Sequence, residues 1–286
     1  MPKAPKIVEK LCKTALSKCG LSYDYTINPY TGCLHGCVYC YANFMRRFSS
    51  HLQDPWGTFV DVKVNLLDVL AQELPRRPGG SVWLSSVCDP YQQVEAKYKL
   101  TRGAIELLSA YAKYSVSILT KNALILRDLD LLNRIKDRLD IGFTITTFNP
   151  KAQPFFEPNA SPLRERMNAL RKLNSEGFDT WVFIAPILPS VTETALEQGL
   201  RDLAMTGVKK LMTDRYNARG MIINQTIRAY ERWNPTIDLQ ELRQLLWKGD
   251  EYYDMLDRKI SRIWKTESPN ANHARDMDWQ LSRTIS

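Results

Sequence analysis

The chain has 286 residues, of which 44% are hydrophobic and 24% are charged, and this balance predicts a globular protein with a sizeable buried core. No apolar run approaches the length of a membrane span and the first residues carry no apolar signal region, so we expect a cytoplasmic protein. The formal net charge of +8 favours polyanionic partners such as nucleic acid, although ordinary solubility charge explains the same value.

The first part of the chain has weaker patterns than the rest. Residues before 23 form a basic lead-in for which we expect a helix, and residues 25–28 have the pattern of a short strand. Pro29 and Gly32 then turn the chain into a loop. Helical patterns follow at residues 42–48 and 65–74, and prolines and glycines end the second of these helices.

An alternation of strands and helices begins near residue 82. The predicted strands are 82–87, 116–119, 141–147, 180–185 and 209–213, and the helices between them are 101–113, 126–139, 161–174 and 193–205. Ser161 and Pro162 are typical of a helix cap and first turn, and Gly177 ends that helix. Short connections between alternating elements predict parallel strands with right-handed crossovers, in an α/β sheet or barrel. Residues 216–233 and 239–264 then have helical patterns, and a loose polar tail or cap is expected from residue 266.

Residues 31–41 read T-G-C-L-H-G-C-V-Y-C-Y and place Cys33, Cys37 and Cys40 within eight positions. Three thiolates this close can each bind one iron of a cubane cluster, which leaves the fourth iron without a nearby protein ligand. Zinc is the rival, but it prefers four ligands, and His35 inside the loop would strain a tetrahedral site. A disulfide is disfavoured because three clustered cysteines cannot pair evenly. Cys12 and Cys19 lie upstream and have no assigned role.

The spacing Cys-x-x-x-Cys-x-x-Cys, with Tyr39 before the third cysteine, resembles the signature of the radical S-adenosylmethionine (SAM) enzymes. The resemblance implies a 4Fe–4S cluster on Cys33, Cys37 and Cys40, whose open iron binds SAM and whose electron cleaves it to a 5′-deoxyadenosyl radical. It also implies a partial (β/α)6 TIM-type barrel of parallel strands with a helical C-terminal extension. We therefore expect a lead-in (1–22), a barrel (23–214) and a helical C-terminal layer with a tail (215–286).

Within the superfamily, the chain resembles the spore photoproduct lyase-like branch, also called DNA repair photolyase-like. The stretches that carry this resemblance are C-V-Y-C-Y (37–41), S-V-C-D-P-Y-Q-Q-V-E (86–95), L-T-R (100–102), L-T-K (119–121), R-D-L-D-L-L (127–132), F-T-I-T-T (143–147), E-P-N-A-S-P-L-R-E-R (157–166) and P-I-L-P (186–189).

The branch implies roles for matching residues at strand ends. Cys88 and Asp89 match residues near the methionyl group of SAM, Lys121 matches a lysine that faces the SAM carboxylate, and Thr144 matches a hydroxyl residue near the ribose. A strand-end lysine can form a charge-assisted bond with a carboxylate, although Lys121 is also interpretable as a solvated loop cation. Asp89, which precedes a proline, is equally typical of a turn or a helix cap.

Two tyrosines and two arginines complete the implied site. Tyr39 and Tyr41 match tyrosines that lie beside SAM and the hydrogen-transfer route, and an aromatic ring there can stack on adenine. Arg127 and Arg164 are candidates for a substrate anion, but arginines on helix surfaces are far commoner.

The chain departs from the lyases at the hydrogen-atom donor. The lyases carry a cysteine that returns a hydrogen atom to the substrate radical, and the matching residue here is Ser86. A serine O–H bond is too strong for that role, so Cys88 is the substitute candidate, although in a strand the two side chains would share a face at different depths. The candidate catalytic residues are Cys88, Tyr39 and Tyr41. The candidate SAM-binding residues are Tyr39, Ser86, Cys88, Asp89, Lys121 and Thr144.

The resulting hypothesis is a radical SAM enzyme supplied with low-potential electrons by a ferredoxin or a flavodoxin. Charge and branch favour a nucleic acid lesion or base as substrate, with a peptide or a small metabolite as the alternative. Candidate nucleic-acid contacts are Tyr216, Arg219, Tyr230 and Arg232. A non-catalytic metal-bearing nucleic-acid binder and an electron-transfer module are the hypotheses of other classes.

Overall fold

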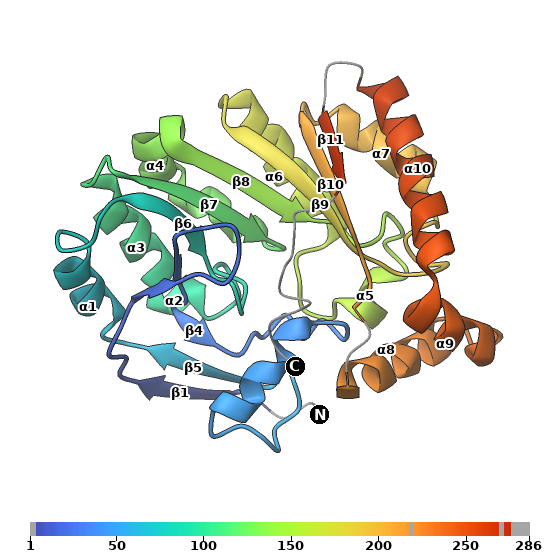
Figure 1. Ribbon diagram of the computed structural model, residues 1–286, viewed down its shortest axis with the longest axis horizontal. Coiled ribbons are helices and arrows are strands. Elements are labelled where there is room, and N and C mark those ends of the chain that lie inside the picture. Colours follow the sequence, from blue (N-terminus) through green and yellow to red (C-terminus); the bar gives the residue numbers. More distant parts are fainter. Residues whose placement is uncertain (1–3, 218–219, 269–271, 276–286) are drawn as a thin grey trace. The chain divides into compact units, whose positions relative to one another are not determined.

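The computed structural model describes residues 4–217, 220–268 and 272–275 (Figure 1). Contacts among these residues divide them into two compact units. Unit 1 contains residues 4–36 and 42–142, and unit 2 contains residues 37–41 and 143–275. The boundaries predicted at residues 22 and 214 stay a prediction.

Unit 1 contains a three-stranded sheet, and two of its strands come before the cysteine loop in the sequence. Its strands are β1 (Lys6–Lys10), β5 (Phe59–Lys63) and β4 (Tyr30–Thr31), in the order β1-β5-β4. The helix predicted before residue 23 is wrong, because this segment forms β1 and also β2 (Leu16–Lys18). Most side chains of β1 are exposed, and main-chain pairing with β5 holds it in place. The apolar alternation that would reveal a half-buried strand is therefore missing from its sequence.

The other strands of unit 1 belong to a larger sheet with the order β2-β3-β6-β7-β8. They are β2, β3 (Tyr25–Ile27), β6 (Gly80–Leu84), β7 (Tyr114–Thr120) and the first residues of β8 (Leu139–Thr144). β3, β6 and β7 pair in parallel, as predicted. The strand predicted at 82–87 ends earlier, at Leu84, because Ser85 has a positive φ of 69° and leaves the extended conformation.

Helical segments of unit 1 connect these strands. They are η1 (Tyr41–Phe48, with Tyr41 itself in unit 2), α1 (Leu66–Glu73), α2 (Glu95–Tyr98), α3 (Leu100–Ser109), η2 (Ala123–Asp128), α4 (Leu129–Leu132) and η3 (Asn133–Arg138). The continuous helix predicted at 126–139 is wrong. Near the start of this segment Arg127 forms ion pairs with Glu95 and Asp128, and Ile135 has non-helical dihedrals.

Unit 2 continues the parallel pattern with the strand order β8-β9-β10-β11. Its strands are the end of β8, β9 (Asp179–Ile187), β10 (Lys210–Arg215) and β11 (Asn272–Arg275). β10 pairs in parallel with both β9 and β11. The loose tail expected from residue 266 is therefore wrong at residues 272–275, which form the strand β11.

The helices of unit 2 are α5 (Gln153–Phe156), α6 (Leu163–Ser175), α7 (Leu196–Ala204), α8 (Gly220–Trp233), α9 (Leu239–Lys248) and α10 (Asp250–Glu267). α10 packs against α7. The helical stretch predicted at 239–264 is confirmed as helical but breaks at Gly249 into α9 and α10. The predicted cap of α6 is wrong, because Pro162 takes the N-cap position and Ser161 lies before it. Over the residues that the structure describes, no helix combines the length and apolar character of a membrane span.

Gly199 in α7 provides a test of the packing in unit 2. A Cβ at this position would collide with the Cβ and ring of Phe148, atoms too close to the backbone to move away easily. We predict that Gly199→Ala lowers the free energy of unfolding by about 1–2 kcal/mol, because overpacking exceeds the roughly 1 kcal/mol gained in helix propensity. Gly20→Ala is the control, since nothing lies within 4 Å of its added Cβ. Equal unfolding temperatures of the two variants in a thermal melt would contradict this packing.

Candidate active site

The cysteine loop follows β3 and β4, as the sequence predicts, and contains no helix or strand between Gly32 and Cys40. Cys33 belongs to unit 1, and Cys37 and Cys40 belong to unit 2, so the two sides of the loop are described in turn. Cys33 and Cys37 are buried and Cys40 is half-buried.

On the unit 1 side, the carboxamide of Gln92 binds the backbone on both sides of Cys33. Its Oε1 accepts a hydrogen bond from the amide of Leu34 at 2.9 Å, and its Nε2 donates to the carbonyl oxygen of Gly32 at 3.0 Å. The Gln92 side chain is fully buried. Gly32 has a φ of 91°, and a Cβ there would lie 2.5 Å from the carbonyl oxygen of Phe59, so this position requires glycine. Gln92 and Gly32 together hold the main chain around Cys33 in one conformation.

Asp89 organises the end of β7. Its carboxylate accepts hydrogen bonds from the hydroxyl of Thr120 and the amide of Lys121, both at 2.7 Å, and from the amide of Tyr91 at 2.8 Å. The buried ring of His35 lies 3.4 Å from the same carboxylate, through Nδ1. Its Nε2 lies 3.4 Å from the side-chain amide of Asn122. Both His35 nitrogens therefore face protein partners, which disfavours the zinc alternative.

The remaining unit 1 candidates lie in the loop after β6. Ser86 exchanges hydrogen bonds with the side chain of Asn28, at 3.2 and 3.4 Å. Because β6 ends at Leu84, Ser86 and Cys88 are not in a strand, and the expectation that they share one strand face is wrong. Cys88 is a half-buried residue whose thiol lies beside Ser85 and the backbone of Tyr30, and desolvation there raises the pKa of the thiol to about 12. At neutral pH its S–H bond is therefore intact.

Arg127, the first residue of the stretch 127–132, forms ion pairs with other side chains of unit 1. Its Nη2 pairs with Glu95 Oε1 at 2.8 Å, and its Nε pairs with Asp128 Oδ1 at 2.8 Å. Glu95 is fully buried and also accepts from the Tyr30 hydroxyl. These bonds oppose a role in holding a substrate anion. Arg164 is exposed on α6, and Lys121 is half-buried.

On the unit 2 side, a buried ion pair binds Tyr39, which lies between Cys37 and Cys40. Glu157 Oε2 pairs with Arg166 Nη2 at 2.5 Å, and each side chain is only 1–2% exposed. The Tyr39 hydroxyl donates to Glu157 Oε1 and lies 2.9 Å from the hydroxyl of Thr146. Burial, followed by the charge of Glu157, raises the pKa of Tyr39 well above its ordinary value, so this hydroxyl stays protonated. Tyr39 is therefore an anchor of the loop, and its implied place beside SAM stays a prediction.

The other two unit 2 candidates are Tyr41 and Thr144. Tyr41 is half-buried at the start of η1. Thr144 is buried at the end of β8, as expected for a strand-end residue, and its carbonyl oxygen accepts a hydrogen bond from Arg166 Nη1 at 2.8 Å. The implied roles of Tyr41 and Thr144 stay predictions.

Two aromatic residues proposed as nucleic-acid contacts are core residues instead. Tyr216 is 3% exposed and donates to Thr226 at 3.1 Å. Tyr230 is fully buried, donates to the carbonyl oxygen of Pro189 at 2.8 Å and packs edge-on against Phe156. Their rings cannot stack on bases, so this part of the prediction is wrong. Arg219 lies outside the described residues, and Arg232 is exposed on α8.

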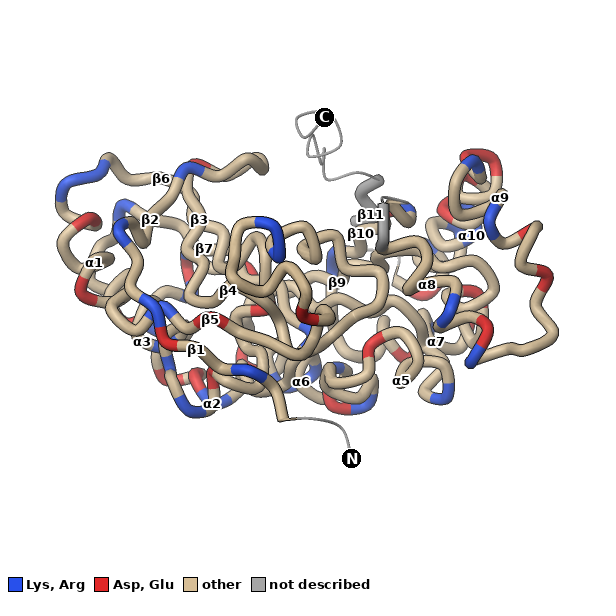
Figure 2. Tube along the Cα trace, turned by 90° about the horizontal axis from the view of Figure 1, so that it is seen from below, with Lys and Arg blue, Asp and Glu red and all other residues tan. Residues whose placement is uncertain are grey.

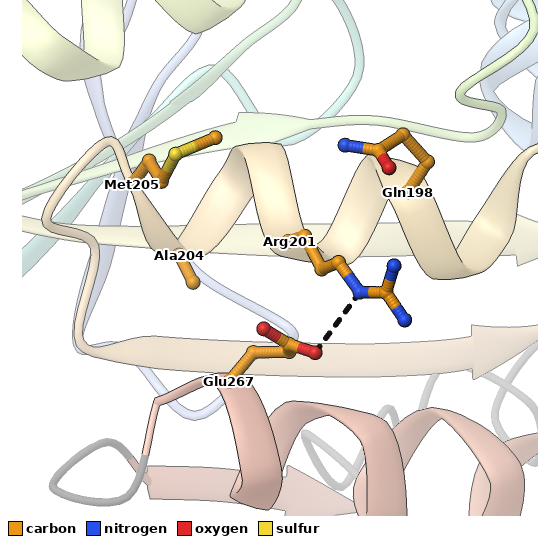
Figure 3. A pocket seen from close by; sticks show the side chains of 5 residues that line it. All are labelled: Gln198, Arg201, Ala204, Met205 and Glu267. Atoms are coloured by element: carbon orange, nitrogen blue, oxygen red, sulfur yellow. Dashed lines mark hydrogen bonds and ion pairs between the residues drawn. The ribbon is translucent and has the colours of Figure 1, made fainter.

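A shallow hollow in unit 2 involves α7 and the end of α10 and contains none of the predicted site residues (Figure 3). It is lined by Gln198, Arg201, Ala204, Met205 and Glu267. Arg201 Nε and Glu267 Oε1 pair there at 3.1 Å. This ion pair links the two helices and explains the polar lining without a ligand.

Sequence reasoning missed Gln92, Glu157, Arg166 and Thr146. Gln92 lies in the stretch 86–95, and Glu157 and Arg166 are the two ends of the stretch 157–166. Both stretches support the family resemblance, and this was the signal that could have indicated these residues. Because Glu157 and Arg166 are nine residues apart, neither helical nor strand spacing indicates that they pair.

Residues 27–203 match the family model of the radical SAM superfamily. The chain belongs to the radical SAM superfamily. It is 36% identical over 169 residues to an uncharacterized protein of Methanocaldococcus jannaschii, a match that covers 59% of this chain and 62% of that protein. It is 30% identical over 273 residues to an uncharacterized protein of Acidianus two-tailed virus, covering 91% of this chain and 83% of that protein.

Among solved structures, the chain is similar to spore photoproduct lyase. A lyase variant with bound S-adenosylmethionine and dinucleoside spore photoproduct has a TM-score of 0.70 and 22% identity, covering 93% of this chain and 81% of that chain. A lyase complexed with dinucleoside spore photoproduct has a TM-score of 0.69 and 21% identity, covering 94% and 82%. This likeness confirms the predicted fold class, an α/β fold of the partial-barrel type with parallel strands and a helical C-terminal extension.

Enzymes of the superfamily use a 4Fe–4S cluster and SAM, so the predicted enzyme class and cofactors are confirmed at that level. The donors here suit a cubane, because three thiols lie within eight residues. In the part of the chain that the structure describes, no three His, Cys, Asp or Glu side chains gather as they would around a single metal ion. A cubane takes one thiolate at each of three separate irons, so its ligands need not converge on one point.

The thiol of Cys88 allows a test by pH. At pH 8 we predict that iodoacetamide alkylates Cys88 in the folded protein at least about tenfold more slowly than in the urea-unfolded chain, because burial suppresses the reactive thiolate. The folded rate should keep rising above pH 10, since the pKa of the thiol is raised. Peptide mapping by mass spectrometry measures both rates. A plateau near pH 9 would show an ordinary, exposed thiol.

Proposed function

We propose that this protein is a radical SAM enzyme in which Cys33, Cys37 and Cys40 hold a 4Fe–4S cluster. The observation that carries the proposal is the cysteine spacing within a chain that matches the superfamily over residues 27–203. When bound, the cluster and SAM supply a 5′-deoxyadenosyl radical, which removes a hydrogen atom from the substrate.

The residues of the chain have binding and positioning roles in this proposal. Gln92 holds the backbone around Cys33, and Glu157 holds Tyr39. Lys121 is proposed to pair with the SAM carboxylate, as a strand-end cation can. Asp89, whose oxygens bind the amide of Lys121 and the hydroxyl of Thr120, fixes the strand end that presents this lysine. Thr144 is proposed to face the ribose and Tyr41 the hydrogen-transfer route.

The reaction requires a reductant of low potential, and a ferredoxin or a flavodoxin is the proposed electron donor. Cys88 is proposed to donate the hydrogen atom that returns to the substrate radical. Its thiol is protonated at neutral pH, and a thiol gives up a hydrogen atom more readily than the hydroxyl of Ser86.

The cluster assignment is tested with anaerobically reconstituted protein, dithionite and SAM. We predict that the wild-type protein forms 5′-deoxyadenosine and that Cys37→Ser reduces this product to the background rate, because one iron loses its thiolate. Cys19→Ser is the matched control, a half-buried cysteine outside the loop that should leave the rate unchanged. Product formation by Cys37→Ser at the wild-type rate would refute the assignment.

We further propose that the substrate is a nucleic acid lesion or base. The net charge of +8 and the likeness to spore photoproduct lyase support this class. Lys and Arg are interspersed with Asp and Glu along the described chain rather than gathered in one run, so any such contact would come from separate segments (Figure 2).

The substrate class is tested by oligonucleotide binding at several salt concentrations. A site that neutralises about four phosphates of a single strand should give a slope of about −3 in a plot of log binding constant against log salt concentration, because counterions are released. Fluorescence anisotropy measures the slope. A flat plot would favour a peptide or a small metabolite instead.

A further inference from the structure

Two consecutive residues at the end of α5, Phe156 and Glu157, bind two consecutive residues of the cysteine loop. The carbonyl oxygen of Phe156 accepts a hydrogen bond from the amide of Val38 at 3.0 Å, and the carboxylate of Glu157 accepts one from the hydroxyl of Tyr39. Val38 and Tyr39 are the only residues between Cys37 and Cys40 in the sequence. This contact therefore fixes the loop at the point from which two of the three thiols project.

The carboxylate that makes this contact is itself held rigidly. Arg166 reaches Glu157 through Nη2, the carbonyl oxygen of Thr144 through Nη1 and that of Ser161 through Nε, the last two at 2.8 Å. The hydroxyl of Thr146 lies 2.9 Å from Glu157 Oε1. Every nitrogen of the guanidinium and both oxygens of the carboxylate thus have partners, as a buried ion pair requires.

α8 contacts the same stretch. The hydroxyl of Thr226, which is fully buried, lies 3.4 Å from the carbonyl oxygen of Val38 and 3.0 Å from that of Ile222. The hydroxyl of Tyr216 donates to Thr226. Both polar groups of the Val38 backbone therefore have partners within unit 2.

A packing role alone does not explain this arrangement. Removing a carboxylate and a guanidinium from water is unfavourable, and apolar side chains of similar volume often fill such a site equally well. The ion pair instead fixes the direction of the Tyr39 side chain through its hydroxyl, because hydrogen bonds depend on angle as well as distance.

We propose that Glu157, oriented by Arg166, is a positioning residue that fixes the directions of Cys37 and Cys40 through Tyr39 before the cluster binds. This inference rests on the proposed function of those cysteines as cluster ligands. Groups that orient metal ligands commonly change metal affinity by about 10- to 100-fold when they are removed.

The test uses Tyr39→Phe, which keeps the ring and removes the hydroxyl that reaches Glu157. Its matched control is Tyr98→Phe, which removes a hydrogen bond from a tyrosine to Glu9 at the surface. We predict that the reconstituted Tyr39→Phe protein loses its cluster to an iron chelator at least about tenfold faster than the wild type. The reduced cluster should also give a shifted electron paramagnetic resonance spectrum, and the control should match the wild type in both measurements.

A second variant tests whether Glu157 acts through Tyr39. Glu157→Gln should also speed cluster loss, and the double variant Tyr39→Phe with Glu157→Gln should lose the cluster no faster than Glu157→Gln alone, because the two residues share one path. Additive effects would overturn the path through Tyr39.

The outcomes separate this inference from the proposed function. Tyr39→Phe with the wild-type rate of cluster loss and spectrum overturns the inference, as does a lower unfolding temperature with an unchanged cluster. Neither result affects the requirement for Cys37 in 5′-deoxyadenosine formation, which tests the proposed function by itself.

Discussion

The backbone of the cysteine loop needs more hydrogen-bond partners than its own residues supply. Between Gly32 and Cys40 there is no helix or strand, yet most of this stretch is buried, and buried peptide groups without partners are costly. Gln92 serves Gly32 and Leu34 in unit 1, and Phe156 serves Val38 in unit 2. The loop holds its conformation through bonds to residues far along the sequence, so its geometry depends on the integrity of both units.

Among the described residues, buried charge is not confined to Glu157 and Arg166. In unit 1, Glu95 accepts hydrogen bonds from the Tyr30 hydroxyl, the amide of Thr101 and the guanidinium of Arg127. Tyr30 lies in β4, three residues before Cys33. The stretches 86–95, 100–102 and 127–132 therefore owe part of their character to one ionic cluster behind the start of the loop. Motifs that indicate a family can thus reflect how a site is supported as much as how it reacts.

The sequence was informative where a pattern is local. Parallel strands buried on both faces have continuous apolar runs, and the run Val82–Leu84 made β6 predictable for that reason. The cysteine loop was predictable from spacing alone. β1 was not, because its side chains are mostly exposed and its stability comes from pairing with β5. The partners of Glu95 and Glu157 could not be predicted either, because ion pairs between residues far apart in the sequence produce no periodic pattern.

Aromatic residues in α8 illustrate a further limit. Tyr230 and nearby arginines have the composition of a nucleic-acid surface, but Tyr230 is fully buried against Phe156 and donates to Pro189. Composition states which residues a helix carries, and only packing determines which of them reach solvent.

The short strand β11 has a practical consequence for anyone who shortens this protein. Its four residues pair with the side of β10 that β9 does not, so a chain cut after α10 would leave the amides and carbonyls on that side of β10 without a partner strand. Bare strand edges recruit strands from neighbouring molecules, and such a truncation should therefore favour aggregation over a smaller, well-behaved domain.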